Sequence, residues 1–110
     1  MMINKDVGRL EDIVNCITKI EQYLPSSEKI FFENELIQNL FVRQIQIIGE
    51  AARALSEEFR SKHPQVPWKD IIGMRHFIVH QYTDIKLETV WEVVTKDLPK
   101  LKSQIQILID

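Results

Sequence analysis

Apolar residues recur at alternating steps of three and four along most of the 110-residue chain. This spacing places apolar side chains on one face of an α-helix. It is clearest over residues 4–24, 34–60 and 85–108, and no segment shows the strict alternation of a half-buried strand. The sequence therefore predicts an all-α fold, with long helices that bury one face each.

Prolines divide this pattern into separate helices. Pro25 follows the first apolar stripe, and Pro67 suits the first turn of a third helix that runs from about residue 68 to 80. Pro99 lacks an N–H group and would clash with the carbonyl of Thr95, so we expect a kink or a break in the last helix. At about 100–200 residues per domain, residues 1–110 form a single domain. The expected architecture is an antiparallel bundle of four to five helices.

Composition excludes several classes of protein. A hydrophobic content of 45% and a charged content of 27% are typical of globular domains and not of disordered tails. Apolar runs are far shorter than the ~20 residues of a membrane span, and the start of the chain has no secretory signal. Cys16 is the single cysteine, which excludes an intrachain disulfide and a cysteine-rich zinc site. We expect a cytoplasmic protein without membrane association.

Positive charge is concentrated in one part of the chain. Residues 60–82 carry a net charge of +3 in a chain whose net charge is −2, and they include all three histidines. Lys62 and Lys69 are candidates to contact the backbone of an RNA, or they are ordinary solvated lysines. If they contact RNA, neutralising them makes binding less dependent on salt.

Two charged residues interrupt an apolar row of the second predicted helix. Arg43 and Glu50 are seven residues apart, so their side chains project in the same direction. Buried charges are costly unless they are paired. The pair therefore indicates either a structural ion pair or exposed edge, or a second layer of residues that supports a polar site.

The third predicted helix carries four polar side chains on one face. At about 100° per residue, Tyr82, Arg75, His76 and His80 fall within an arc of about 160°. Three interpretations fit this arrangement. His76 and His80 have the spacing of a helical zinc site, although Phe77 stands where a zinc protease needs a glutamate. The histidines could instead satisfy a polar interface in a protein-binding module.

Metal-free RNA cleavage is the third interpretation. An arginine holds a phosphate in a bidentate manner and stabilises charge that develops on it. A histidine titrates near neutral pH and can move the proton of a 2′-hydroxyl or of a leaving oxygen. The residue types alone do not select among the three interpretations.

The segment that runs from Pro67-Trp68 through Gly73-Met74 to Tyr82 resembles the signature of the HepT-like proteins of the HEPN superfamily. Their motif, Arg-x4-His-x-Tyr, is matched by Arg75, His80 and Tyr82. Residues 47–52, 90–91 and 97–99 also resemble the corresponding parts of the family. The similarity covers nearly the whole chain.

This resemblance implies a metal-independent endoribonuclease toxin, with some family members acting on tRNA. It implies a two-fold homodimer in which the motif helices share a cleft, with no cofactor. Arg75 would bind the scissile phosphate and His80 would act as general acid and base, leaving a 2′,3′-cyclic phosphate. Many family members have Asn or Asp after the arginine, where this chain has His76, a candidate second acid or base.

The resemblance also implies a partner and a regulatory modification. An MntA-like nucleotidyltransferase antitoxin would transfer AMP from ATP onto Tyr82. The added charge and bulk would repel RNA from the neighbouring arginine. The alternative is a non-catalytic helical module that pairs with a nucleotidyltransferase or binds a nucleotide.

Overall fold

The computed structural model describes residues 4–80 and 86–110, with the backbone alone for Asn4 and residues 75–80. These residues form seven α-helices and one π-helical segment. They are α1 (Asn4–Gln22), α2 (Glu28–Phe32), α3 (Glu35–Ala54), α4 (Glu57–Lys62), α5 (Trp68–His80), α6 (Leu87–Glu92), the π-helix η2 (Val93–Asp97) and α7 (Leu98–Ile109). The predicted all-α class is confirmed.

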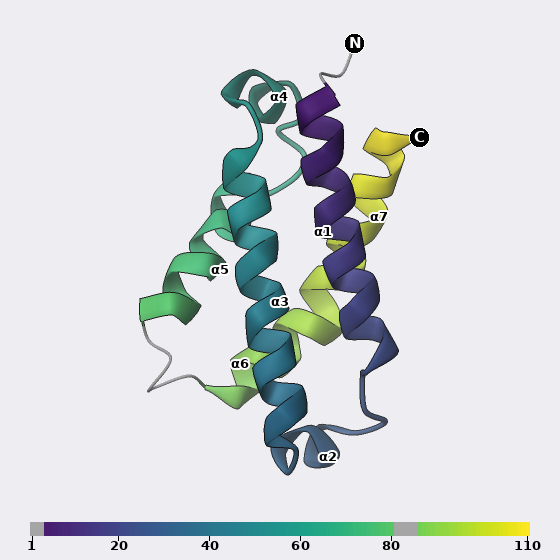
Figure 1. Cartoon of the computed structure of the whole chain (residues 1–110), viewed down its shortest axis with the longest axis vertical. Helices are drawn as coiled ribbons and strands as arrows, with labels where there is room; N and C mark the ends of the chain where they lie inside the picture. Colours follow the sequence, from purple (N-terminus) through teal and green to yellow (C-terminus); the bar gives the residue numbers. More distant parts are fainter. Residues whose placement is uncertain (1–3, 81–85) are drawn as a thin grey trace.

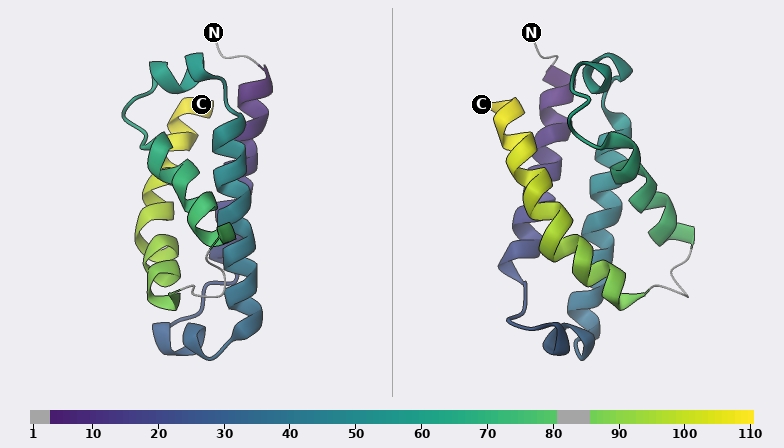
Figure 2. Two further views of the ribbon diagram at one scale, coloured as in Figure 1. Left: turned by 90° about the vertical axis from the view of Figure 1, so that its left-hand side faces the viewer. Right: turned by 180° about the vertical axis from the view of Figure 1, so that it is seen from behind.

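Four long rods make up the bundle (Figure 1). They are α1, α3, α5 and the continuous rod formed by α6, η2 and α7, and successive rods run in opposite directions. Helix α3 packs against α1 on one side and against α5 on the other, while α7 packs against α1. Figure 2 shows the molecule from the left-hand side of Figure 1 and from behind, with α6 and α7 forming the face opposite α3. Helix α5 therefore lies at one edge of the bundle.

The core forms where the apolar faces of these rods meet. Ile13 of α1, Phe41 of α3 and Ile105 of α7 are completely buried. Trp68 and Ile71 attach α5 to this core. Trp91 packs against Phe31 with the ring centroids 5.3 Å apart. Both tryptophans therefore serve as anchors of the fold.

The predicted helix over residues 34–60 is two helices in the structure. Helix α3 ends at Ala54, and Ser56 caps α4 by accepting a hydrogen bond from the Phe59 N–H at 3.1 Å. The carboxylate of Asp6, only 2% exposed, accepts hydrogen bonds from the Ser56 N–H and hydroxyl, both at 2.9 Å. This contact with α1 favours the cap over a further helical turn.

The bend expected at Pro99 takes the form of a π-helical segment. Five residues, Val93–Asp97, form the wider turn, and Pro99 lies in the first turn of α7. In a continuous helix a proline removes one hydrogen bond and crowds the carbonyl four residues before it, and here the wider π-helical turn lies directly before Pro99. The rod bends without ending, which is why α6 and α7 continue as one element (Figure 2).

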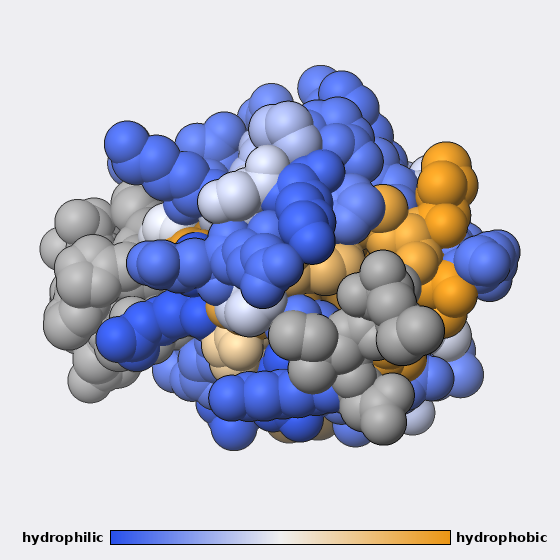
Figure 3. Space-filling view, turned by 90° about the horizontal axis from the view of Figure 1, so that it is seen from above, coloured by the Kyte–Doolittle hydropathy of each residue, from blue (hydrophilic) through white to orange (hydrophobic). Residues whose placement is uncertain are grey.

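The end of the bundle that carries α4 has a mainly hydrophilic surface (Figure 3). A hydrophobic area lies at the side where α7 ends, and Ile107 of α7 is 75% exposed. No helix in the part of the chain that the structure describes has the length and apolar character needed to span a membrane.

Candidate active site

Helix α5 carries the motif residues and begins at the residue predicted from the sequence. Its first turn is held by Trp68, whose indole N–H donates a hydrogen bond to the His63 carbonyl at 2.9 Å. The helical backbone continues to His80, so Arg75 and His76 follow in the register that the sequence predicts. Tyr82 lies outside the described residues.

A hollow of about 400 Å³ lies between α5, α3 and the rod formed by α6 and η2. It is bounded by Gly73 and Met74 of α5, by Ile45 of α3, and by residues of α6 and η2. A methyl group placed on Gly73 would meet no atom within 4 Å. The hollow shows that this part of α5 lies level with the middle of α3.

A second hollow of about 440 Å³ lies between α4 and the start of α5. Lys69, Arg60 and Trp68 contribute to its walls, together with Glu57, Ser61 and Ile72. Ile72 and Lys69 fall on the same side of α5 as His76, at about 100° per residue. The hollow therefore continues the motif face of α5 towards its N-terminus.

The two lysines selected from the sequence have different surroundings. Lys62 donates a hydrogen bond to the Glu58 carboxylate at 3.0 Å, and both side chains are about two-thirds exposed. Lys69 forms no ion pair within the described part of the chain. Lys69 is therefore the better candidate for an anion contact.

Arg60 is a further candidate, which the sequence pattern did not single out. It lines the hollow beside Lys69, and its Nε is buried with no hydrogen-bond partner among the described residues. A buried donor without a partner is uncommon in a native structure. The clustering of positive charge over residues 60–82 was the signal that could have identified it.

Arg43 and Glu50 do not form the intrachain ion pair that was one interpretation of their spacing. Both are exposed on α3, and the described chain contains no salt bridge between them. Seven residues correspond to a rise of about 10 Å along the helix, which is too far for direct contact. The exposed-edge interpretation is the one that the structure supports.

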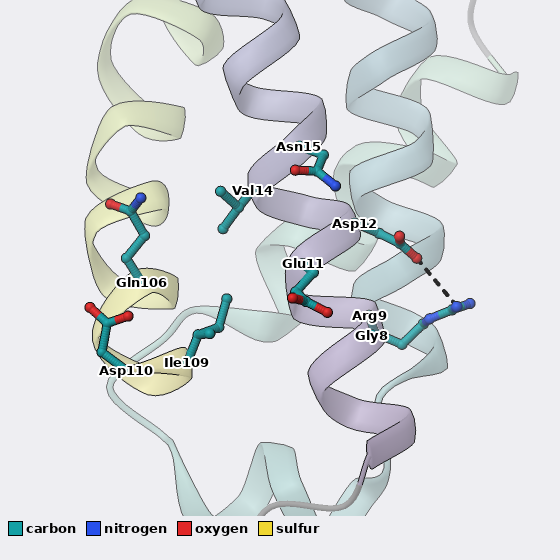
Figure 4. Close-up of a pocket in the computed structure, with 9 residues that line it drawn as sticks. All are labelled: Gly8, Arg9, Glu11, Asp12, Val14, Asn15, Gln106, Ile109 and Asp110. Carbon is teal, nitrogen blue, oxygen red and sulfur yellow. Dashed lines mark ion pairs between the residues drawn. The ribbon is translucent and has the colours of Figure 1, made fainter.

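A larger hollow, of about 490 Å³, lies between α1 and α7 (Figure 4). Its lining includes the carboxylates of Glu11, Asp12 and Asp110, and Asp12 forms an ion pair with Arg9 at 3.3 Å. Helix α3 separates this region from α5 (Figure 1). Carboxylates repel phosphates, so this hollow does not suit an RNA substrate.

Cys16 is not suited to act as a nucleophile. It is buried on α1, and burial together with the negative charge of Asp12 raises the pKa of its thiol. A raised pKa keeps the thiol protonated, whereas the thiolate is the reactive form. Among the described side chains, which do not include those of His76 and His80, there is no group of three or more metal-ligating residues.

Comparison with known proteins identifies the family. The model of the family described as "Ribonuclease HepT-like" matches residues 13–108 of this chain. The chain belongs to the HepT-like ribonuclease family. That match spans α3, α5 and most of α7, and so includes the helix that carries Arg75 and His80.

Two relatives match over almost their whole length. "Putative RNase" of Caldanaerobacter subterraneus subsp. tengcongensis is 38% identical over 101 residues, which cover 91% of this chain and 90% of that protein. "Probable ribonuclease HepT" of Thermococcus cleftensis is 33% identical over 103 residues, which cover 90% of this chain and 91% of that protein. No solved structure matches the chain significantly. Family membership therefore supports ribonuclease activity.

Proposed function

We propose that this protein is a metal-independent endoribonuclease and the toxin of a toxin–antitoxin pair in the cytoplasm. The observation that carries the proposal is the motif Arg75-x4-His80-x-Tyr82 in a chain of the HepT-like ribonuclease family. Two copies form a homodimer in which both α5 helices face one cleft. The substrate is RNA, with tRNA as the first candidate.

The chemistry requires one group that stabilises charge and groups that move protons. Arg75 binds the non-bridging oxygens of the scissile phosphate and stabilises the charge that develops on them. His80 accepts the proton of the 2′-hydroxyl, whose oxygen then attacks phosphorus. The bond from phosphorus to the 5′-oxygen breaks, and a proton donated by His76 or by the partner's motif completes the leaving hydroxyl. The products are a 2′,3′-cyclic phosphate and a 5′-hydroxyl.

The test is cleavage of total tRNA by the unmodified protein in EDTA. Mass spectrometry first establishes that Tyr82 carries no AMP. Cleavage that persists in EDTA and leaves a 2′,3′-cyclic phosphate supports the proposal. Cleavage that EDTA abolishes would point to a metal site at His76 and His80, and no cleavage under any condition would favour the non-catalytic binding module.

Neutralisation by the antitoxin depends on Tyr82. We expect an MntA-like nucleotidyltransferase to transfer AMP from ATP onto the Tyr82 hydroxyl, with release of pyrophosphate. Tyr82→Phe removes that hydroxyl, so the variant should keep cleaving RNA after incubation with antitoxin and ATP, while the parent protein loses activity. The measurement is RNA cleavage alongside intact mass. Equal inhibition of the variant and the parent would contradict the role of Tyr82.

RNA backbone contacts are proposed at Lys69 and Arg60, with Lys62 as a weaker candidate because Glu58 already neutralises it. In a His80→Ala background that cannot cleave, Lys69→Ala should lower the salt slope of log Kd by about 0.7, the value for one phosphate contact in a single strand. Lys62→Ala changes the net charge equally and should lower the slope less, because Glu58 pairs with Lys62. A Lys69→Ala slope equal to that of the parent protein would remove Lys69 from the interface.

A further inference from the structure

Gly73 lies in the middle of α5, and packing within the chain does not explain its presence. A glycine inside a helix is destabilising relative to alanine, so it usually marks a place where another group approaches the backbone closely. Here a methyl group on Gly73 would meet no atom within 4 Å. The space beside it belongs to the hollow between α5, α3 and the rod formed by α6 and η2. The glycine therefore keeps this hollow wider than any other residue would.

The hollow has the size and the lining of a small-molecule site. Helices α5 and α6 each pack against α3, and the hollow of about 400 Å³ lies where they meet (Figure 1). Small-molecule sites measure about 300–1,000 Å³ and combine apolar walls with a few polar groups. The apolar walls here come from Ile45, Met74, Val90 and Val93. Exposed polar side chains are contributed by Lys69, Asp70 and Thr89. This lining suits a flat ring with polar groups on its edge.

The hollow lies on the motif side of α5. At about 100° per residue, Lys69 and Gly73 fall within an arc of about 60° that also contains both motif histidines. Gly73 precedes His76 by three residues, which corresponds to a rise of about 4.5 Å along the helix. Lys69 belongs to the walls of this hollow and also to those of the hollow that Arg60 lines. A phosphate bound by Lys69 would therefore place an adjoining base beside the hollow.

We propose that this hollow binds one nucleobase of the RNA and that Lys69 binds a phosphate next to that base. The proposal deepens the ribonuclease function proposed above and rests on it for the identity of the ligand. Proteins recognise single-stranded RNA by taking up unstacked bases and forming hydrogen bonds along their edges. The Asp70 carboxylate accepts hydrogen bonds, and the Thr89 hydroxyl both donates and accepts them. These two groups contact the edge of the base, and Gly73 leaves room for its ring.

Binding of mononucleotides tests the subsite without cleavage. The nucleoside 5′-monophosphates of A, C, G and U are compared with ribose 5-phosphate, which has the phosphate and lacks the base. Burial of the ring should make at least one nucleotide bind the parent protein about tenfold more tightly than ribose 5-phosphate. Gly73→Leu extends a side chain into the hollow, and leucine is favourable in helices. This variant should lose the difference between nucleotide and ribose 5-phosphate. The measurement is Kd by NMR titration.

Gly8→Leu is the matched control. A methyl group on Gly8 of α1 would also meet no atom within 4 Å, but Gly8 lines the hollow between α1 and α7. The control should therefore bind nucleotides as the parent protein does. Lys69→Ala removes the phosphate contact alone, so it should weaken nucleotides and ribose 5-phosphate by the same factor. Circular dichroism checks that each variant folds, and analytical ultracentrifugation checks its oligomeric state.

The same titration locates the base without any substitution. In the parent protein the amide signal of Gly73 should be among those that shift most when the nucleotide is added, while the amide signal of Gly8 should not move. A ligand that leaves the Gly73 signal unchanged would contradict the proposal even if Gly73→Leu failed to fold.

Three further results would overturn the subsite. The first is a parent protein that binds no nucleotide more tightly than ribose 5-phosphate, and the second is a Gly73→Leu variant that binds nucleotides as the parent does. The third is a change of oligomeric state in Gly73→Leu, because the hollow would then be occupied by a second copy of the chain. A protein that binds the base and cleaves no RNA leaves the subsite standing and contradicts the ribonuclease function instead.

Discussion

Alanine at His80 should slow RNA cleavage by about 10²–10⁴-fold, the usual contribution of a positioned acid or base. Alanine at Arg75 should slow it by about 10²–10³-fold, the usual cost of removing one group that stabilises transition-state charge. Both losses should appear in the rate of the chemical step under single-turnover conditions. The assay is the cleavage of tRNA in EDTA described above.

Two conservative variants separate chemistry from structure. Arg75→Lys keeps the positive charge and loses the planar fork that binds a phosphate in a bidentate manner, so it should recover only part of the lost rate. His76→Asn keeps a side chain that can form hydrogen bonds and removes the imidazole that can transfer a proton. If His76 is a second acid or base, this variant should be slower than the parent protein.

Folding of these variants is checked independently of cleavage. Among the described side chains of α5, those of Trp68 and Ile71 are buried in the core, two turns or less before the motif begins. Helical content and melting temperature should therefore change little in Arg75→Ala and His80→Ala. Variants that remain folded and cleave at the parent rate would exclude these residues from the active site.

The sequence predicted the helices well where apolar periodicity and proline agreed. Helix α5 spans the predicted residues because Pro67 precedes its first turn and Trp68 and Ile71 face the core. The predicted bend at Pro99 is also present, although local chemistry did not reveal that a π-helix would absorb it. Apolar periodicity and the positions of the prolines were sufficient to predict these two features.

Long-range contacts explain what the sequence did not predict. The break between α3 and α4 depends on Asp6, which is fifty residues from Ser56 and hydrogen-bonds to it across the bundle. The local sequence at residues 55–56 does not predict such a contact. The short helix α2 was also missed, because five residues are too few to show a periodicity.

The candidate site was predicted from the motif and not from packing. Spacing placed Arg75, His76 and His80 on one helix, and the structure gives that helix. Spacing could not decide between the two interpretations of Arg43 and Glu50, because a periodic row does not say whether another helix covers it. Nor could it distinguish Lys62 from Lys69, whose difference comes from an ion pair within α4.

Loss of the Asp6 carboxylate should destabilise the fold more than loss of any exposed charge. Asp6 is 2% exposed and accepts two hydrogen bonds from Ser56 at 2.9 Å. Hydrogen bonds to a charged group contribute about 1.5–3 kcal/mol, and Asp6→Ala leaves the Ser56 N–H without its acceptor. We expect the free energy of unfolding to fall by about 2–3 kcal/mol, and Tm by roughly 10 °C.

Asp12→Ala is the matched control on the same helix. Asp12 pairs with Arg9 at 3.3 Å, but both side chains are nearly half exposed, and such pairs contribute about 0.2–1 kcal/mol. Thermal and urea unfolding of the two variants measure the difference. Equal losses of stability would show that the Asp6–Ser56 contact does not stabilise the junction between α3 and α4.

The Asp6 variant also tests how the scaffold supports the site. Helix α4 leads through His63 to Trp68, whose indole hydrogen-bonds to the His63 carbonyl and sets the start of α5. If the Asp6–Ser56 contact only stabilises the fold, cleavage well below the melting temperature should proceed at the parent rate. If it also positions α5, the rate should fall while the helical content stays unchanged, because a small displacement of a catalytic group is costly. The two outcomes separate stability from geometry in a single variant.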